Sequence, residues 1–495
     1  MRKGLVTPLP FGANACTHLF SGHEVFSVIP CVRDSGGGRE RHVWFGTWAV
    51  RRRAAEKGGC DFLAAVVARR TVCLRKLGGR RSREVRFGRF LRNGAVTARE
   101  MIETAACATG LRCAGRHVLA IQDTTEINFA AHAGSKRGFG TVGNGEDIGL
   151  FLHPLIALDA EHGGIIGLAG AQVLNRTGGK VANRRTRALA DKESQRWLNG
   201  MESARQALHG AARVTVVGDR ESDIYGLFAQ RDQGLDLLVR AAQNRSLEDG
   251  GALFEAVRSW PRQDRYMIDV PAKPGELARQ AEVTLRFGRV SLKRPPTVPG
   301  SLPASLDLQV VDVREENPPE GRKPVHWLLL TSHQVGNAAE ARQIVAWYRR
   351  RWTIEQVFRT LKSQCLDIEQ SQIMDPEPLS KLLIIALIAA VTVMQLVHAR
   401  DGATGQRLAD AAISLDARFL SALCALLEGN TQKQKNPHPP ESLAWLSWIA
   451  GRLGGWSGYT GKGYKPAGPK TMHDGLIQLE AQHQGWTIAQ CRRNV

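Results

Sequence analysis

Three acidic residues of this sequence, Asp123, Asp219 and Glu355, stand where carboxylates could act together on a phosphate ester. Asp123 and Asp219 each end a short run of β-branched and apolar residues, HVLAIQD at 117–123 and VTVVGD at 214–219. Open α/β sheets bind ligands beyond the carboxyl ends of their strands, so both side chains are well placed for chemistry. An aspartate at such a position is also a common turn former or helix cap, and neither one alone identifies a site.

Glu355 belongs to a segment that we expect to form one helix, IVAWYRRRWTIEQVFRTLKS at 344–363. Tyr348, Arg351, Glu355 and Lys362 follow one another at intervals of three, four and seven residues. At roughly 100° per residue, these intervals place all four side chains on one narrow face of a helix. A polar stripe of this kind is often simply solvated. Here apolar residues at its margins put it beside buried surface, with the carboxylate next to two cations and a phenol.

Converging carboxylates are what phosphodiester cleavage by two metal ions requires. One ion activates the attacking water or 3′-hydroxyl, and the other stabilises the leaving oxygen. Basic side chains on the same face can hold the phosphates of the strand that is cut. The three carboxylates and their basic neighbours therefore predict a metal-dependent reaction on DNA.

Four motifs occur in an order that resembles a known family. The Tyr348, Arg351, Glu355 and Lys362 spacing is similar to the YREK signature of the insertion-sequence-four transposases, the family of the transposon-five enzyme. The other similar segments are AIQDTT at 120–125, VGDRESDIY at 217–225, LLVRAA at 237–242, WLLLTS at 327–332 and VRFGRFLRN from residue 85. The resemblance covers about residues 85–400.

The resemblance implies an α/β protein with an RNase H-like catalytic core. Asp123, Asp219 and Glu355 would be the catalytic residues and would bind two Mg²⁺ or Mn²⁺ ions. The partners would be double-stranded DNA, both element ends and target, and a second copy of the chain when DNA is bound.

The resemblance also implies a set of DNA-binding residues. Trp327 is similar to the aromatic residue that stabilises a flipped base beside the cleavage site, and an indole ring can compensate for lost base stacking. Without the resemblance, Trp327 would be interpreted as an ordinary core tryptophan on a strand. The side chains implied to contact the DNA of the element end are Tyr348, Arg351, Lys362 and Arg240.

The charge of the chain fits a polyanionic partner. It holds 67 Lys and Arg against 47 Asp and Glu, a formal net charge of +20. Residues 1–100 alone hold 20 basic and 7 acidic residues. Each phosphate that such a surface neutralises releases a counterion, which favours binding. An inert basic surface is the alternative that charge alone leaves open.

Changes in composition predict four regions. Residues 1–44 show no clear period and are irregular, or else an over-extended translation start. Residues 45–110 predict a basic helical DNA-binding domain. Residues 111–400 predict an α/β domain, RNase H-like by the resemblance, with a β-rich insertion at about 250–330. Residues 401–495 predict a helical domain that could serve dimerisation. Thr97 and Glu100, within the basic region, form the pattern of a capping box.

Three features suggest other classes and are set aside. Nine scattered cysteines form no CxxC pair, which argues against a disulfide framework or a zinc site and favours a reducing, cytoplasmic compartment. The apolar run at 382–397 is short for a membrane span and is expected to be a buried helix, so no membrane is implied. GFGTVG at 138–143 matches GxGxxG, but a polar loop precedes it and a strand-like run follows, so it does not predict dinucleotide binding.

The resemblance therefore implies a DNA transposase that cuts element ends and transfers strands by a cut-and-paste route through a DNA hairpin. Two alternatives remain. One is an RNase H-like nuclease or resolvase that uses the same carboxylates without strand transfer. The other is a non-catalytic DNA-binding derivative of such an enzyme.

Overall fold

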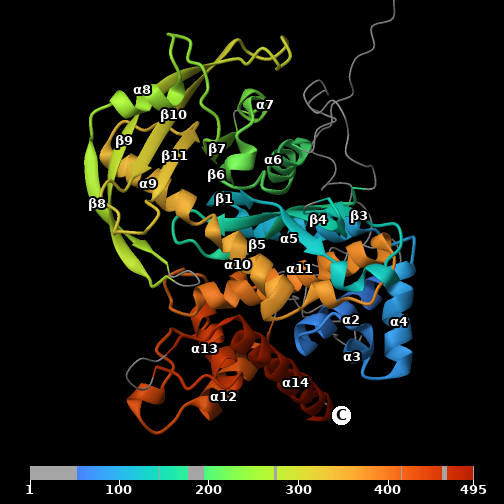
Figure 1. Ribbon diagram of the computed structural model, residues 1–495. Coiled ribbons are helices and arrows are strands. Elements are labelled where there is room, and N and C mark those ends of the chain that lie inside the picture. The colour runs from blue at the N-terminus through green and yellow to red at the C-terminus, as the bar shows by residue number, and fades with distance from the viewer. Residues whose placement is uncertain are drawn as a thin grey trace, which may run out of the picture.

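The computed structural model describes residues 53–143, 145–176, 194–232, 234–271, 276–413, 415–459 and 465–493 (Figure 1). Its strands are β1 (His117–Gln122), β2 (Thr125–Asn128), β3 (Gly140–Val142), β4 (Asp147–Asp159), β5 (Ile165–Leu174), β6 (Arg213–Gly218), β7 (Leu235–Arg240), β8 (Asp264–Val270), β9 (Arg279–Lys293), β10 (Ser305–Arg314) and β11 (His326–Thr331). Its α-helices are α2 (Arg53–Arg69), α3 (Leu74–Gly78), α4 (Arg81–Arg92), α5 (Ala98–Cys113), α6 (Gln195–Ala207), α7 (Tyr225–Ala229), α8 (Leu253–Ser259), α9 (Ala338–Arg349), α10 (Trp352–Arg359), α11 (Pro376–Ala399), α12 (Ala417–Leu427), α13 (Leu443–Leu453) and α14 (Pro469–Arg493).

All of these strands join one mixed sheet, which confirms the expected α/β class. The order along its main path is β2-β4-β1-β6-β7-β11-β10-β9-β8, with β3 and β5 paired to β4. The centre is parallel, because β1 pairs with β6 and β6 with β7 in the same direction. β4 runs antiparallel to β1, and the long β4 also pairs with β2, which continues the chain after β1.

The strands after β7 extend the same sheet. β11 returns antiparallel beside β7, and β10, β9 and β8 follow as antiparallel neighbours. These four strands lie together at the upper left of Figure 1. Their positions agree with the strand-like runs expected at about 265–330, so the β-rich segment is an extension of the central sheet.

Alternating side chains of β1 face two different cores. Leu119 and Ile121 face the larger core with α9, α10 and α11, and Val118 and Ala120 face a second core with α6 and α7. This alternation is the two-residue period of a strand buried on both faces. The sheet is therefore the middle layer between two helical layers.

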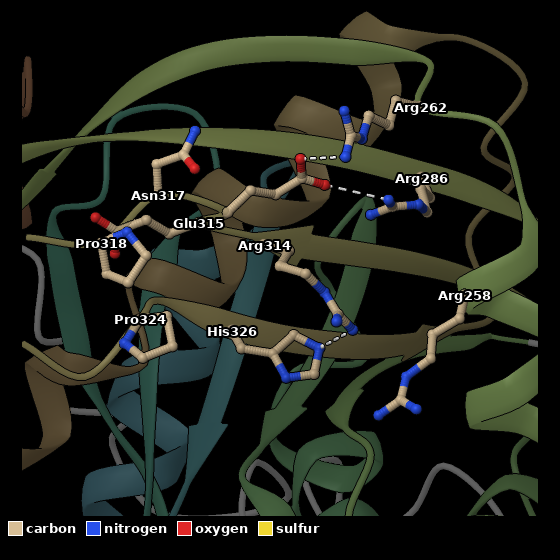
Figure 2. A pocket seen from close by; sticks show the side chains of 10 residues that line it. Arg258, Arg262, Arg286, Arg314, Glu315, Asn317, Pro318, Pro324 and His326 are labelled. Atoms are coloured by element: carbon tan, nitrogen blue, oxygen red, sulfur yellow. Dashed lines mark hydrogen bonds and ion pairs between the residues drawn. The ribbon is translucent and has the colours of Figure 1, made fainter.

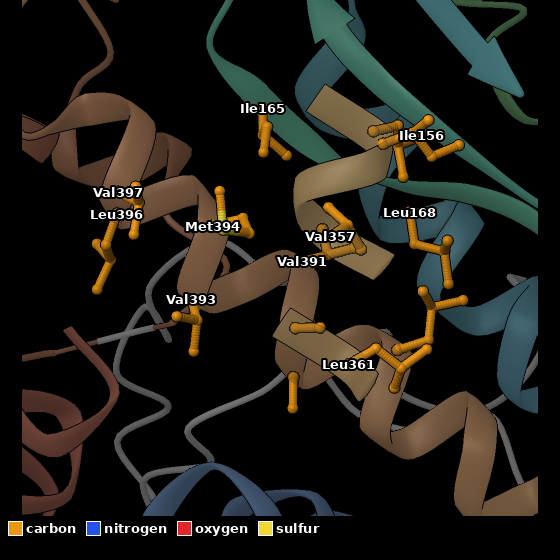
Figure 3. Close-up of a cluster of buried hydrophobic side chains, with 14 of the residues drawn as sticks. Ile156, Ile165, Leu168, Val357, Leu361, Val391, Val393, Met394, Leu396 and Val397 are labelled. Atoms are coloured by element: carbon orange, nitrogen blue, oxygen red, sulfur yellow. The ribbon is translucent and has the colours of Figure 1, made fainter. Parts of the chain in front are cut away.

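The apolar helix α11 is the centre of the larger core. It is the one helix in the described part of the chain that is long and apolar enough to cross a membrane, yet 89% of its most apolar window is buried inside the protein. Figure 3 shows Val391 of α11 beside Val357, which follows Glu355 in the chain, and Met394 of α11 on the side toward Ile165 of β5. Burial of α11 thus fixes the helical segment that carries Glu355 against the sheet.

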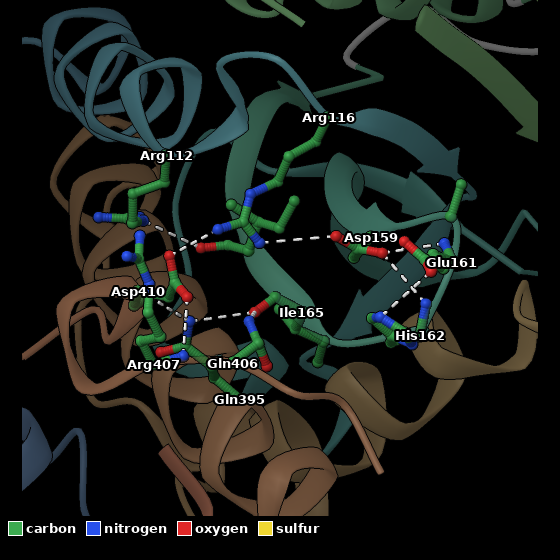
Figure 4. Close-up of polar contacts among 12 residues, drawn as sticks. Arg112, Arg116, Asp159, Glu161, His162, Ile165, Gln395, Gln406, Arg407 and Asp410 are labelled. Carbon is green, nitrogen blue, oxygen red and sulfur yellow. Dashed lines mark hydrogen bonds and ion pairs between the residues drawn. The ribbon is translucent and has the colours of Figure 1, made fainter. Parts of the chain in front are cut away.

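Polar contacts also tie the C-terminal region to the sheet. Arg116 forms ion pairs with Asp159 at 3.5 Å and with Asp410 at 2.7 Å (Figure 4). Gln395 and Gln406 both donate hydrogen bonds to the Ile165 carbonyl oxygen, at 3.0 and 2.9 Å. These contacts join the residue before β1, the end of β4 and the start of β5 to α11 and to the segment that follows it.

Several local predictions can be compared with the structure. The capping box at the start of α5 is present, with the Thr97 side chain accepting from the Glu100 amide. The GxGxxG match contains β3, and β4 follows it, so it lacks the strand-turn-helix context of a dinucleotide site. The division into domains stays a prediction, and the expected irregular segment 1–44 lies outside the described residues.

The single helix expected at 344–363 is not continuous. α9 ends at Arg349, α10 begins at Trp352, and a π-helical turn occupies Thr360–Gln364. Arg350 and Arg351 keep helical backbone angles between the two helices, so the axis is interrupted without a loop. The predicted face therefore holds across the α9–α10 junction, whereas the π-turn changes the direction of side chains after Arg359.

Candidate active site

Asp123 and Asp219 lie directly after two adjacent parallel strands. β1 ends at Gln122 and β6 at Gly218, and Ile121 is paired with Val217 in the register of the two strands. Each aspartate continues the row of odd-numbered side chains that faces the α9–α11 layer. Both carboxylates are thereby directed toward the helical layer that contains Glu355.

Backbone amides hold the two aspartates in their turns. Asp123 Oδ1 accepts a hydrogen bond from the Thr124 amide at 2.8 Å, and Asp219 Oδ1 accepts one from the Glu221 amide at 2.8 Å. The residue before Asp219 must be glycine, because a Cβ at Gly218 would overlap the Ser222 hydroxyl oxygen. The turn after β6 is thus built for a close approach of the chain around Asp219.

Arg351 joins two of the three carboxylates. Its Nη1 lies 2.7 Å from Asp123 Oδ2, and its Nη2 lies 2.9 Å from Glu355 Oε1. The guanidinium is nearly buried, and its Nε has no hydrogen-bond partner in the described part of the chain. One arginine therefore links the end of β1 to the first turns of α10.

Burial raises the pKa values of the two aspartates. The pKa of Asp123 is raised to about 7, mainly by burial; the nearby Asp219 and Glu355 also raise it, while Arg351 lowers it. Burial also raises the pKa of Asp219 above its ordinary value. Clustered, partly desolvated carboxylates of this kind favour a bound cation.

Tyr348, Arg240 and Trp327 lie beside this cluster. The Tyr348 hydroxyl interacts with both Arg240 and Arg351, and burial raises its pKa. The rings of Trp327 and Tyr348 have centroids 6.0 Å apart and are tilted by 58°. Arg240 also donates a hydrogen bond to the His326 carbonyl oxygen at 2.7 Å. The structure thus brings together seven of the eight residues singled out in the sequence.

Lys362 is the residue that lies apart. It belongs to the π-helical turn, and its Nζ is 3.5 Å from Glu369 Oε1. Glu369 in turn accepts a hydrogen bond from the Asn128 amide at the end of β2. The expected narrow face of four polar residues is thus realised for Tyr348, Arg351 and Glu355, and Lys362 points to a different neighbour.

A buried histidine behind Asp123 was not expected from the sequence. His153 of β4 lies 2.8 Å from the Thr124 hydroxyl and 3.1 Å from Gln122 Oε1, and its ring meets Trp197 edge to face. Burial lowers the pKa of His153 to about 3, so it is neutral at physiological pH. The signal was a histidine inside the apolar run LFLHPLIAL, which a purely structural strand does not require.

Asp223, within the VGDRESDIY segment, has a structural role. It is fully buried and pairs with Arg245 at 2.6 Å, and it accepts hydrogen bonds from the amides of Ala242 and Gln243. The nearby Tyr225 donates a hydrogen bond to the Pro303 carbonyl oxygen at 2.9 Å. This network fixes the turn after β7 next to the turn after β6, and so fixes Arg240 relative to Asp219.

The carboxylates suit a divalent metal ion by type and by charge. Mg²⁺ and Mn²⁺ prefer carboxylate oxygens, and three carboxylates converge here with raised pKa values on two of them. Among the described residues, however, no three His, Cys, Asp or Glu side chains are already arranged around one point. Arg351 lies between Asp123 and Glu355, so the carboxylates fit the ion once that guanidinium moves aside.

Comparison with known protein families agrees with this arrangement. Residues 152–392 match the family model described as the transposase DDE domain. The matched segment begins in β4 and ends in α11, so it contains Asp219 and Glu355 and starts after Asp123. The match supports a transposase DDE domain in this part of the chain.

Proposed function

We propose that this protein is a cut-and-paste transposase of the insertion-sequence-four family, with Asp123, Asp219 and Glu355 as its catalytic carboxylates. The observation that carries the proposal is their convergence from β1, β6 and α10 around one buried arginine. The match to the transposase DDE domain supports the reaction class. The spacing of Tyr348, Arg351, Glu355 and Lys362 supports the narrower family.

The strand order supports an RNase H-like core for this enzyme. β5, β4, β1, β6 and β7 are successive neighbours, and β4 runs antiparallel to both β5 and β1 while β1, β6 and β7 are parallel. In such a core the first two carboxylates follow adjacent central strands, and the third comes from a later helix that packs over them. Asp123 follows β1, Asp219 follows β6 and Glu355 belongs to α10, which is consistent with such a core.

The chain's own residues would orient the scissile phosphate. Asp123, Asp219 and Glu355 would hold two Mg²⁺ or Mn²⁺ ions, which when bound activate the attacking hydroxyl and stabilise the leaving oxygen. Arg351 and Arg240 flank the Tyr348 hydroxyl and offer donors to phosphate oxygens. Burial of these groups excludes water and strengthens each contact.

The route would pass through a DNA hairpin. The 3′-hydroxyl freed by the first nick would attack the opposite strand, and water would then open the hairpin. Trp327 is partly buried against the core and next to Tyr348, so its remaining exposed surface is available to an unstacked base. A DNA-bound homodimer would hold both ends together.

Strand transfer separates this proposal from a simple nuclease. We expect purified protein with Mg²⁺ or Mn²⁺ to nick DNA that carries the element's end, to form a hairpin and to join the end to a target plasmid. Glu355→Gln should lower each rate by at least about a hundredfold while DNA binding is kept. Glu103→Gln, an isosteric change on the exposed side of α5, is the matched control.

Other products would point to the alternatives. Nicking that depends on Glu355 without hairpins or joined products would identify a nuclease or resolvase. Tight DNA binding without any cleavage would identify a non-catalytic derivative. Cleavage by Glu355→Gln at the wild-type rate would exclude the proposed site.

A further inference from the structure

One face of the extended sheet carries polar side chains in two cross-strand rows. Residues directly opposite each other on paired strands share a face of the sheet. The register of β9, β10 and β11 therefore aligns Arg286, Asp312 and Leu328 in one row and Thr284, Arg314 and His326 in the next. The Leu328 carbonyl oxygen accepts a hydrogen bond from the Ala241 amide. The first row therefore reaches the end of β7.

This face is hollowed where α8 stops covering it. Two adjoining cavities of about 290 and 680 Å³ lie there, and Arg258, Arg314 and His326 line both of them. Figure 2 shows the larger one, with Arg258 from the end of α8 on one side and Glu315 and Asn317 on the other. We call the two cavities together the arginine groove.

The arginine groove holds more cations than carboxylates. The smaller cavity is lined by four arginines and one carboxylate, and the larger by four arginines and two carboxylates. Glu316 pairs with Arg262 at 2.5 Å and with Arg286 at 3.2 Å. In the described part of the chain, the exposed Arg258 and Arg220 form no ion pair. Their guanidinium groups are available to an anion.

A buried carboxylate fixes the cations in place. Asp312 is 1% exposed, lies 2.9 Å from His326 Nε2, and forms ion pairs with Arg286 at 3.5 Å and Arg314 at 3.7 Å. Its Oδ2 has no hydrogen-bond partner among the described residues, so the pairing is electrostatic and leaves donors of Arg314 able to face the groove. Fixed cations lose less side-chain entropy when an anion binds.

The groove lies on the face of the sheet opposite to the α9–α11 layer that the candidate carboxylates face, and it reaches the candidate active site at the ends of the strands. Arg220 directly follows Asp219, and Arg240 interacts with Tyr348, and both line the smaller cavity. From β7 across β11 and β10 to β9, three strand spacings amount to about 14 Å. One strand of duplex DNA carries a phosphate about every 3.4 Å along the helix axis, so this length suits a few successive phosphates.

We propose that the arginine groove binds the sugar–phosphate backbone of the DNA strand that leads away from the scissile phosphate, with Arg258 and Arg314 in contact with phosphates. This proposal rests on the proposed function for the identity of the strand. The binding itself requires only cations with donors that face the groove. Phosphate contacts carry no base information, so the groove positions DNA and does not select its sequence.

Salt dependence of DNA binding tests this assignment without catalysis. The full-length protein would be titrated in EDTA against a fluorescent duplex of the element end, from 50 to 200 mM NaCl. The affinity falls as salt rises, and each phosphate contact makes this fall steeper. Removal of one phosphate-binding cation should therefore decrease the absolute slope of log K against log salt by about 0.9. We expect that decrease for Arg258→Ala and for Arg314→Ala, and about twice as much for the double variant.

Arg289→Ala is the matched control. Arg289 is an exposed arginine of β9. It lies three residues from Arg286, and so on the face of the sheet opposite to the groove, and it pairs with Asp307. Its slope should equal that of the wild type. Because Arg258 is exposed and unpaired among the described residues, its variant should also keep the wild-type melting temperature.

The outcomes separate this inference from the proposed function. Wild-type slopes in the Arg258 and Arg314 variants, or an equal decrease in Arg289→Ala, would overturn the groove while leaving catalysis untouched. Lowered slopes in a protein that never cuts DNA would retain the groove and overturn the transposase proposal. A wild-type protein that does not bind the duplex would overturn both.

Discussion

At the scale of single residues, Arg351 holds the side chains of the candidate site together. Its guanidinium contacts Asp123 and Glu355 and interacts with Tyr348, so one cation joins the end of β1 to two neighbours from its own helical segment. A buried cation between two carboxylates neutralises them at short range. A divalent ion and a phosphate could divide these contacts, with the ion taking the carboxylates and the phosphate taking the arginine.

The raised pKa of Asp123 predicts that ionisation of this carboxylate lowers the free energy of unfolding. A variant without the carboxylate should not show this loss. Its pKa is about 7 in the folded protein against an ordinary 3.8, so the folded state binds this proton more tightly than the unfolded chain does. The resulting stability is complete below about pH 4 and is lost as the pH rises to about 7. Asp123→Asn cannot ionise and escapes this loss.

We therefore expect Asp123→Asn in EDTA to gain stability relative to the wild type between pH 5 and pH 8. The gain should be on the order of 2 kcal/mol. The melting temperature of Asp123→Asn minus that of the wild type should therefore be a few degrees larger at pH 8 than at pH 5. Thermal unfolding at the two pH values measures it. A difference between the proteins that does not change with pH would show that Asp123 titrates normally.

The sequence predicted the carboxylates but not the way they are held. Asp123 and Asp219 could be found because a strand end is visible in a short apolar run, and Glu355 because a helix face is visible in its spacing. The contacts of Arg351 with Asp123 and of His153 with Thr124 join residues far apart in the chain. Helical spacing predicted Arg351 beside Glu355, but it carries no information about the pair that Arg351 forms with Asp123.

At the scale of elements, regular patterns were predictable and local irregularities were not. The β-branched runs of β1 and β6 and the β-rich segment of the extended sheet agree with the observed strands. β5 was not predicted, because IIGLAGAQVL is rich in small residues and has no polar alternation. The interruption between α9 and α10 involves residues with helical backbone angles, which leave no mark in composition.

Two glycines of α14 should respond in opposite ways to the same substitution. A Cβ at Gly475 would overlap the Ala450 carbonyl oxygen of α13, whereas a Cβ at Gly485 would meet nothing within 4 Å. Gly475→Ala should therefore destabilise the protein by about 1–3 kcal/mol through overpacking. Gly485→Ala should stabilise it by up to about 1 kcal/mol, because alanine favours the helix.

Chemical denaturation of the two variants and the wild type would measure both effects. The pair shares a helix, a residue type and a substitution, so propensity alone predicts the same sign for both. Stabilisation by Gly475→Ala would show that α13 and α14 are not in close contact in solution.

At the scale of the whole molecule, one sheet connects the candidate active site to the arginine groove. β7 ends beside the carboxylates, and β11, β10 and β9 extend from it without a break in pairing. A strand of DNA held in the groove would thus be positioned by the same sheet that positions Asp123 and Asp219. The net charge of +20 supplies the long-range attraction for such a partner.

The α/β class could be predicted from the sequence, whereas the continuity of the sheet could not. The strand-like runs at about 250–330 predicted a β-rich insertion within the catalytic domain, but they did not show how its strands pair. Which strand pairs with β7 depends on contacts between residues far apart in the chain, such as Leu329 with Arg240. The groove depends on that pairing, and so it was not visible in the sequence.

The most direct test of the central claim is cleavage of labelled DNA that carries the element's own end, by wild type and Asp219→Ala, with Mg²⁺ or Mn²⁺ and with EDTA. We predict a nick and then a hairpin with the wild type and metal, and neither product with the variant or with EDTA. Removal of the Asp219 carboxylate should leave DNA binding in EDTA unchanged. Identical behaviour of the two proteins, or cleavage that persists in EDTA, would contradict the assignment of these carboxylates as a metal-dependent transposase site.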